Sequence, residues 1–187
     1  TVVVIAVSCT GGKKFILESG RKYLLVAGDE ADSLTLKAVS ELETYFNLIT
    51  SEPLLKAGEN DKKPCKIYIG RSAITDSTIR KEVEGLSKDG FLMVSDGNTL
   101  ILSGNNGQSD LYAVYALLEE FAGCMRFTSD EEYIPRARKI EIPRVHKVCE
   151  PAFPFRVAHF PDRSNRSFTD WNRMSTFDDW GMFVHTF

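Results

Sequence analysis

The sequence has few cysteines, no strong excess of charge and no long hydrophobic run, and each absence excludes a class of protein. The formal net charge of −3 over 187 residues leaves no broad basic surface for nucleic acid. No apolar run is long enough to span a bilayer. The cysteines form neither a C-x-x-C pair nor a zinc-knuckle spacing, so we predict no metal site and no cofactor. They are Cys9, Cys65, Cys124 and Cys149.

What is present fits a globular protein with one well-buried domain and the remnant of another. Hydrophobic residues make up 43% of the chain and charged residues 26%, which is ordinary for a globular protein. A chain of 187 residues is too short for two domains of ordinary size. We therefore start from a single core.

The chain opens on an apolar run, Val2–Ser8, followed by Cys9 and a polar stretch. This order resembles the end of a bacterial lipoprotein signal, in which Cys9 becomes the acylated first residue. We predict that residues 1–13 are a signal remnant and tether, with export to the periplasm or to the outer-membrane surface on a lipid anchor. The alternative is a buried edge strand of β-branched residues.

Two apolar runs separated by a helix pattern predict a β-α-β unit. Lys22–Ala27 and Cys65–Ile69 are bounded by turn residues, as buried strands are. Between Ser33 and Thr50, apolar residues recur at steps of three and four, which predicts an amphipathic helix on one side of a sheet. Its face consists of Leu36, Val39, Leu42, Phe46 and Ile49. The strands should pair in parallel through a right-handed crossover.

Further elements complete a mixed sheet. An Asp-Gly-Asn turn at residues 96–98 lies between two apolar runs, which is a strong hairpin signal. The elements predicted beyond residue 70 are a short helix over 72–83, hairpin strands over 90–95 and 99–103, a helix over 108–121 ending at Gly123, and short strands near 125–127 and 139–142. The predicted fold class is α/β, a mixed β-sheet layered with about three helices, over residues 14–150.

The composition changes after Glu150. Nine of the twenty Phe, Trp and Tyr residues, both tryptophans included, lie between Phe153 and Phe187. This density indicates a different environment, so we place a domain boundary near Pro151.

Several local strings resemble one group of proteins. They are the segment 109–127 (SDLYAVYALLEEFAGCMRF), Tyr133-Ile134-Pro135, and Pro151–Arg156 (PAFPFR). The chain from about Phe15 onward resembles the N-terminal domain that precedes the barrel in bacterial α-glucuronidases of glycoside hydrolase family 67. It is also similar to the second domain of family 20 β-hexosaminidases and to uncharacterised exported proteins of Bacteroides-like bacteria.

The resemblance implies that residues 151–187 begin a truncated catalytic (β/α)8 barrel, with its first strand near Phe153–Ala158 and Met182–Thr186 leading into the second. It also implies a role for Arg156, because family 20 enzymes bind sugar hydroxyls with an arginine in a similar Phe-x-x-Arg string. The residues after Arg156 depart from that family, with Val157-Ala158-His159 in place of the usual Gly and Asp.

No convincing pair of catalytic carboxylates is present, although glycoside hydrolysis normally needs two. Asp178-Asp179 and Glu119-Glu120 are best explained as solvated surface. The resemblance implies that the catalytic acids lie on barrel strands beyond Phe187, so we assign no catalytic residue here.

Three aromatic residues near the end are candidates for sugar contact. His185 alternates with apolar residues and would project near the mouth of a barrel, where barrel sites are built. A core histidine is an equally good explanation. Trp171 and Trp180 suit stacking on sugars, although large aromatics fill cores more often. We take His185, Trp180 and Arg156 as predicted substrate-binding residues.

The Gly104–Gly107 loop (GNNG) precedes a helix, and helix amino termini attract anions. It lacks the dinucleotide-binding glycine spacing and the P-loop lysine, so a turn with helix capping explains it better than a phosphate site.

These patterns predict a non-catalytic accessory domain of an exported glycoside hydrolase, which packs against a barrel that binds the carbohydrate. The alternative is a surface glycan-binding module that uses the aromatic tail. A nucleotide-binding α/β domain is a third, weaker hypothesis.

Overall fold

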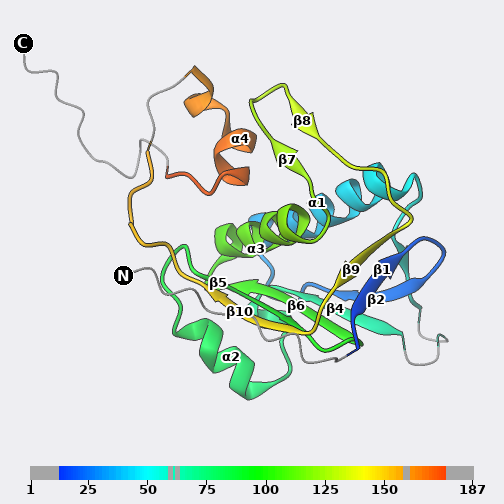
Figure 1. Cartoon of the computed structure of the whole chain (residues 1–187). Helices are drawn as coiled ribbons and strands as arrows, with labels where there is room; N and C mark the ends of the chain where they lie inside the picture. Colours follow the sequence, from blue (N-terminus) through cyan, green and yellow to red (C-terminus); the bar gives the residue numbers. More distant parts are fainter. Residues whose placement is uncertain (1–12, 59–60, 62–63, 158–160, 176–187) are drawn as a thin grey trace, which may run out of the picture.

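A six-stranded mixed β-sheet forms the centre of the computed structural model, which describes residues 13–58, 61, 64–157 and 161–175 (Figure 1). In pairing order the strands are β10 (Val145–Cys149), β5 (Phe91–Ser95), β6 (Thr99–Gly104), β4 (Cys65–Ile69), β2 (Lys22–Val26) and β3 (Leu55–Lys56). Strands β3, β2, β4 and β6 are parallel, whereas β5 is antiparallel to both β6 and β10. The predicted parallel β-α-β unit and the antiparallel hairpin are both confirmed.

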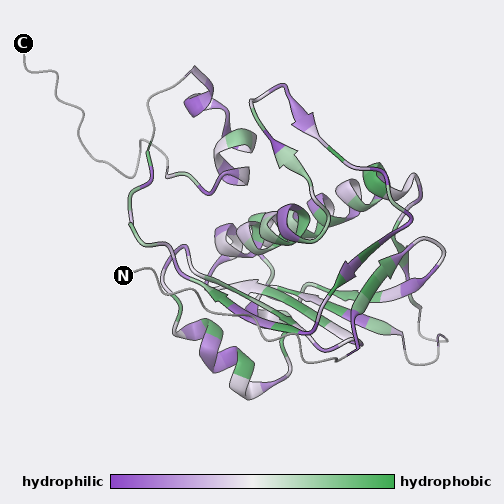
Figure 2. Cartoon of the chain, in the orientation of Figure 1, coloured by the Kyte–Doolittle hydropathy of each residue, from purple (hydrophilic) through white to green (hydrophobic). Residues whose placement is uncertain are grey.

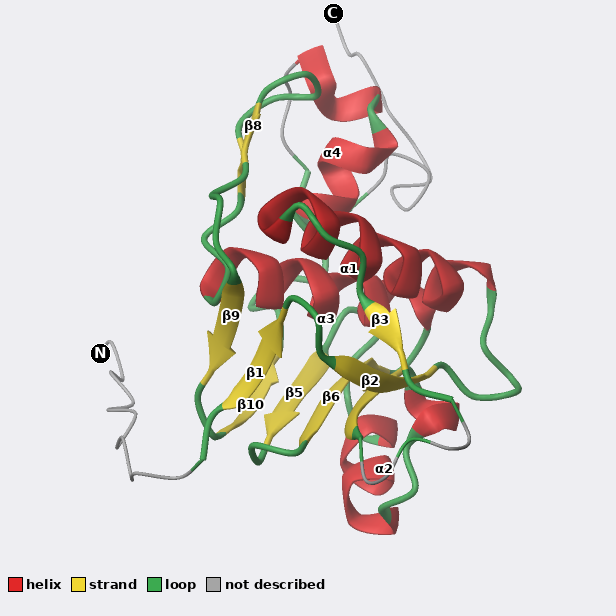
Figure 3. Cartoon of the chain, turned by 90° about the vertical axis from the view of Figure 1, so that its right-hand side faces the viewer, coloured by secondary structure: helices red, strands yellow, loops and turns green. Residues whose placement is uncertain are grey.

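Helices cover both faces of this sheet. Helices α1 (Ser33–Thr50) and α3 (Gly107–Glu120) lie on one face, and α2 (Ser77–Glu84) lies on the other (Figures 1 and 3). Strands β5 and β6 are therefore buried on both sides and carry nearly continuous apolar sequence. Figure 2 shows the matching pattern, with hydrophobic residues along the central strands and hydrophilic residues along much of α2. The predicted α/β class with a mixed sheet and about three helices is confirmed for the described residues.

The face of α1 differs from its prediction at one end. Leu42, Phe46 and Ile49 are buried as expected, and Val39 is partly buried. Leu36 is 54% exposed, because the first turn of α1 instead turns Thr35 inward.

The helix predicted over 72–83 is split in two. A 3₁₀ turn (Arg71–Ala73) is followed by extended backbone at Ile74, and α2 begins only after Asp76. The side chain of Asp76 accepts hydrogen bonds from the amides of Thr78 and Ile79, so it caps the helix at that point.

Two small sheets flank the main one. Strand β1 (Phe15–Glu18), which the sequence did not predict, pairs antiparallel with β9 (Lys139–Ile142). Strands β7 (Met125–Arg126) and β8 (Glu132–Tyr133) form a hairpin at the end of the molecule far from the sheet (Figures 1 and 3).

The region predicted to start a barrel is partly described. Its predicted first strand, Phe153–Ala158, forms no strand over residues 153–157. Pro154 lacks an amide hydrogen, and no described strand runs alongside to pair with this segment. The second predicted strand, Met182–Thr186, lies outside the described residues. A barrel start at Pro151 stays a prediction.

A short helix, α4 (Arg166–Trp171), follows instead and packs on α3. Trp171 is 1% exposed and belongs to the same hydrophobic core as the sheet and α1, although the sequence assigned it to the following domain. Within the described residues, no helix combines the length and apolar character needed to cross a membrane.

Candidate functional site

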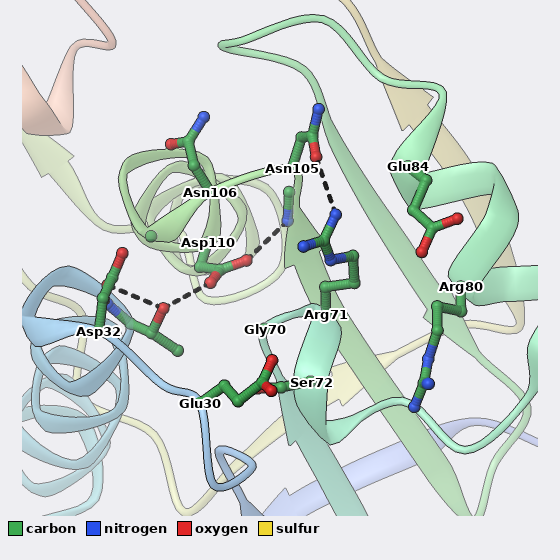
Figure 4. Close-up of a pocket in the computed structure, with 13 residues that line it drawn as sticks. Glu30, Asp32, Gly70, Arg71, Ser72, Arg80, Glu84, Asn105, Asn106 and Asp110 are labelled. Carbon is green, nitrogen blue, oxygen red and sulfur yellow. Dashed lines mark hydrogen bonds between the residues drawn. The ribbon is translucent and has the colours of Figure 1, made fainter.

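A polar cavity of about 410 Å³ lies where β2, β4 and β6 end (Figure 4). After β2 and β6 the chain passes to α1 and α3 on one face of the sheet, but after β4 it passes to α2 on the other. The connections therefore diverge at this point, and such a crevice is where open α/β sheets bind ligands. The cavity is therefore the candidate site.

A buried carboxyl, Asp110 in the first turn of α3, forms the floor of this cavity. It is 3% exposed, and its two oxygens accept hydrogen bonds from the Gly104 amide (2.8 Å) and the Thr35 hydroxyl (2.7 Å). Burial raises the pKa of Asp110, and the hydrogen bonds lower it by a smaller amount, so the pKa is about 6. The carboxyl thus connects β6, α1 and α3, and its protonation changes in mildly acidic solution.

A second carboxylate, Asp32, caps α1 at the edge of the cavity. One oxygen accepts from the amides of Leu34 (2.9 Å) and Thr35 (2.8 Å), and the Thr35 hydroxyl oxygen lies 3.1 Å from it. The single hydrogen of this hydroxyl can bond only one of the two carboxyl groups at a time. The hydrogen bond from the Thr35 amide is the main cause of its lowered pKa. The Thr35 hydroxyl therefore lies between two carboxyl groups, Asp32 and Asp110.

Asp32 also lies against the amino end of α3. A Cβ atom added to Gly107 would be 2.0 Å from Asp32 Oδ1, so only glycine allows this approach. The protein's own carboxylate thus occupies the position that an anion would take at this helix terminus. Asn106 caps α3 by accepting from the Ser109 amide (3.1 Å), which confirms the predicted capping of this loop.

Two arginines lie at the mouth of the cavity. Arg71 donates to Asn105 Oδ1 over 3.4 Å, and Arg80 donates to the Ile74 carbonyl (Nε, 3.2 Å). Acidic Glu30 and Glu84 face them, so the lining carries both signs of charge. The lining residues are polar, charged or glycine, without an aromatic ring for a sugar to stack on. No group of three metal-ligating side chains was found in the part of the chain that the structure describes.

A second cavity, of about 480 Å³, lies beneath the segment after Pro151 and contains Arg156. Each guanidinium nitrogen of Arg156 donates to the chain itself: Nη2 to Asp89 (2.6 Å), Nη1 to the Phe153 carbonyl (2.8 Å) and Nε to the Arg173 carbonyl (2.7 Å). In this structure Arg156 fastens the segment to the domain. The predicted contact with a sugar stays untested.

Glu119 and Glu120 border the same cavity, and both form ion pairs. Glu119 pairs with Arg173, and Glu120 with Lys147 (2.6 Å). Burial raises the pKa of Glu119. Exposed Glu120 fits the solvated surface that the sequence predicted for the two glutamates, whereas Glu119 is partly buried.

Trp171 lies between two tyrosine rings, Tyr45 on α1 (5.0 Å between centroids) and Tyr115 on α3 (4.7 Å). It is a core residue, and the sugar-stacking alternative is wrong for it. Its neighbour Asp170 is 2% exposed and is bound by Lys37, Arg166 and Gln108. Together the two residues attach α4 to the helical layer.

The remaining predicted sites, Cys9, Trp180 and His185, lie outside the described residues. Sequence reasoning missed Asp32, Asp110 and Asp170. The only signal was positional, since Asp32 and Asp110 lie at helix starts, where acidic residues are favoured. Their burial depends on contacts between distant elements.

No protein-family model matches this chain, and no curated protein matches it. Solved structures do match. An N-acetyl-β-hexosaminidase from Streptomyces plicatus has a TM-score of 0.50 at 10% identity and covers 78% of this chain. CpGH84B has a TM-score of 0.50 at 12% identity and covers 93%. BtGH115A, a 4-O-methyl-α-glucuronidase with specificity for decorated arabinogalactans, has a TM-score of 0.49 at 14% identity and covers 76%.

The matches span only part of those proteins: 25% of the hexosaminidase, 30% of CpGH84B and 19% of BtGH115A. At these identities the likeness establishes the fold and nothing finer. The chain therefore has a fold that also occurs as one portion of glycoside hydrolases.

Proposed function

We propose that this chain is the non-catalytic N-terminal accessory domain of an exported glycoside hydrolase, α-glucuronidase-like or hexosaminidase-like, that takes part in glycan degradation. One observation carries the proposal, namely that the fold recurs in glycoside hydrolases as a quarter to a third of a longer chain. The domain stabilises the enzyme by packing against its barrel, and the carbohydrate binds to the barrel.

Three acidic side chains of the two cavities support a structural role. Asp110 and Asp32 bind amides and a hydroxyl of their own chain, and Glu119 is paired with Arg173. Hydrolysis requires one carboxyl free to protonate the leaving oxygen and a second facing the sugar. These three groups are instead engaged in holding helices together.

Some parts of the proposal rest on the sequence alone. These are sugar contacts by Arg156, Trp180 and His185, lipidation of Cys9, and a location in the periplasm or on the outer membrane. The competing hypothesis of a glycan-binding module can no longer include Trp171 as a binding residue, because that ring is buried.

An assay of hydrolysis tests the proposal. The 187-residue chain and the longest polypeptide that its gene encodes are incubated with 4-nitrophenyl β-N-acetylglucosaminide and 4-nitrophenyl α-glucuronide. We expect release of nitrophenol by the longer polypeptide only. Turnover by the 187-residue chain, or inactivity of the longer one on a broad glycoside panel, would contradict the accessory role.

A further inference from the structure

The β7–β8 hairpin exposes three large apolar side chains on one face. Met125, Phe127 and Tyr133 are 53%, 56% and 54% exposed. Met125 pairs directly with Tyr133 across the hairpin, and Phe127 is two residues beyond Met125, so all three side chains point to the same side. Single exposed apolar residues are ordinary on a protein surface, but three on one side of a short ribbon form a patch. We call these residues the hairpin patch.

The opposite face of the hairpin is bound to the domain. Arg126 lies opposite Glu132 in the strand register, and Glu132 Oε2 accepts a hydrogen bond from the Tyr45 hydroxyl on α1 (2.7 Å). Burial raises the pKa of Tyr45, so its hydroxyl remains a donor at physiological pH. This contact orients the hairpin so that the patch faces away from the core.

The tip of the hairpin is bound to the segment that leads into α4. The amide and hydroxyl of Ser129 both donate to the carboxylate of Asp162, at 3.1 and 3.0 Å. Figures 1 and 3 place the hairpin and α4 together, beyond the helical layer and away from the sheet. Strands of two residues are too short to be stable alone, so these contacts hold the patch in a defined position.

We propose that the hairpin patch docks onto a second domain of the same polypeptide, the hydrolase domain of the proposed function on which this inference rests. The Streptomyces plicatus hexosaminidase and CpGH84B, each with a TM-score of 0.50, are three to four times as long as the portion that this chain matches. In both proteins this fold therefore forms part of a larger chain. A second copy of this chain suits the patch less well. A stable dimer buries about 800 Å² on each partner, and three half-exposed side chains supply a small part of that.

Hydrogen exchange tests this docking. Amide exchange over residues 125–133 is measured in the 187-residue chain and in the longest polypeptide that the gene encodes. We expect exchange at least about tenfold slower in the longer polypeptide, because docking removes local opening of the hairpin. Phe127→Asp should restore fast exchange in the longer polypeptide. The matched control is Val148→Asp, because Val148 is 44% exposed and lies far from the hairpin patch. Val148 is paired with Leu92 on the neighbouring strand, and the side chain of Leu92 packs with α2 on the other face of the sheet.

Several outcomes would overturn the docking proposal. They are equal exchange in the two lengths, equal effects of the two aspartate substitutions, a gene that ends at Phe187, and slow exchange that sedimentation velocity traces to a dimer. Protection of the hairpin in a longer polypeptide that hydrolyses no glycoside would support docking while contradicting the proposed function. Hydrolysis by a longer polypeptide whose hairpin is not protected would support the proposed function and contradict docking.

Discussion

Replacing Asp110 by asparagine should remove a pH dependence of stability. The pKa of Asp110 rises from its usual value of 3.8 to about 6 in the folded protein. Between these two values the folded state keeps a proton that the unfolded chain has released. The free energy of unfolding therefore falls as the pH rises from about 4 to about 6, by at most about 3 kcal/mol from this group.

The geometry indicates that asparagine fits this position. Its carbonyl oxygen can accept from the Gly104 amide, as Asp110 Oδ1 does. Its amide can donate to the Thr35 hydroxyl, which then donates to Asp32 Oδ1 at 3.1 Å. Protonated Asp110 would form the same chain of hydrogen bonds, so Asp110→Asn resembles the low-pH state of the native protein.

Urea unfolding of both proteins, followed by circular dichroism at pH 4, 5, 6 and 7, checks this prediction. The free energy of unfolding of Asp110→Asn, minus that of the native protein, should increase by between about 1 and 3 kcal/mol from pH 4 to pH 7. Only the native protein must ionise a buried carboxyl over this range. Asp130→Asn, at an exposed position on the β7–β8 turn, is the control and should show no such trend. A constant difference between Asp110→Asn and the native protein over this range would refute the reasoning.

Three further substitutions have expected outcomes. Trp171→Ala should cost about 3–5 kcal/mol in urea unfolding by leaving a cavity between α1, α3 and α4, and a cost below about 1 kcal/mol would show that α4 is not part of the core. Gly107→Ala should lower the free energy of unfolding by more than about 1 kcal/mol, because the added Cβ would displace the Asp32 cap. The control is Gly85→Ala, whose added Cβ would have its nearest neighbouring atom at 3.5 Å and whose effect in the same assay should stay within about 0.5 kcal/mol. Arg156→Ala should speed limited proteolysis between residues 150 and 165, since it removes the two hydrogen bonds by which Arg156 holds this segment to Asp89 and Arg173. An unchanged cleavage rate would argue that Arg156 does not hold the segment in place.

Local pattern was enough to predict most of the main sheet and its two long helices. The three- and four-residue spacing in α1 and the turn at residues 96–98 depend on neighbours within a few positions, so both can be predicted from the sequence. Strand β1 was missed because it is four residues long and pairs with β9, more than a hundred residues later. Strand β10 was missed as well. It is an edge strand of alternating half-buried and exposed residues, without a strong apolar run.

The sequence by itself determined the order and type of these elements, since backbone preference and hydrophobic spacing are local properties. Only the tertiary structure decided what particular side chains do. Trp171 became a core residue because α1 and α3 place Tyr45 and Tyr115 around it, and Asp110 acquired its raised pKa because α1 and β6 exclude water from it. Burial and electrostatics are sums over residues that are distant in the chain, so no local pattern contains them.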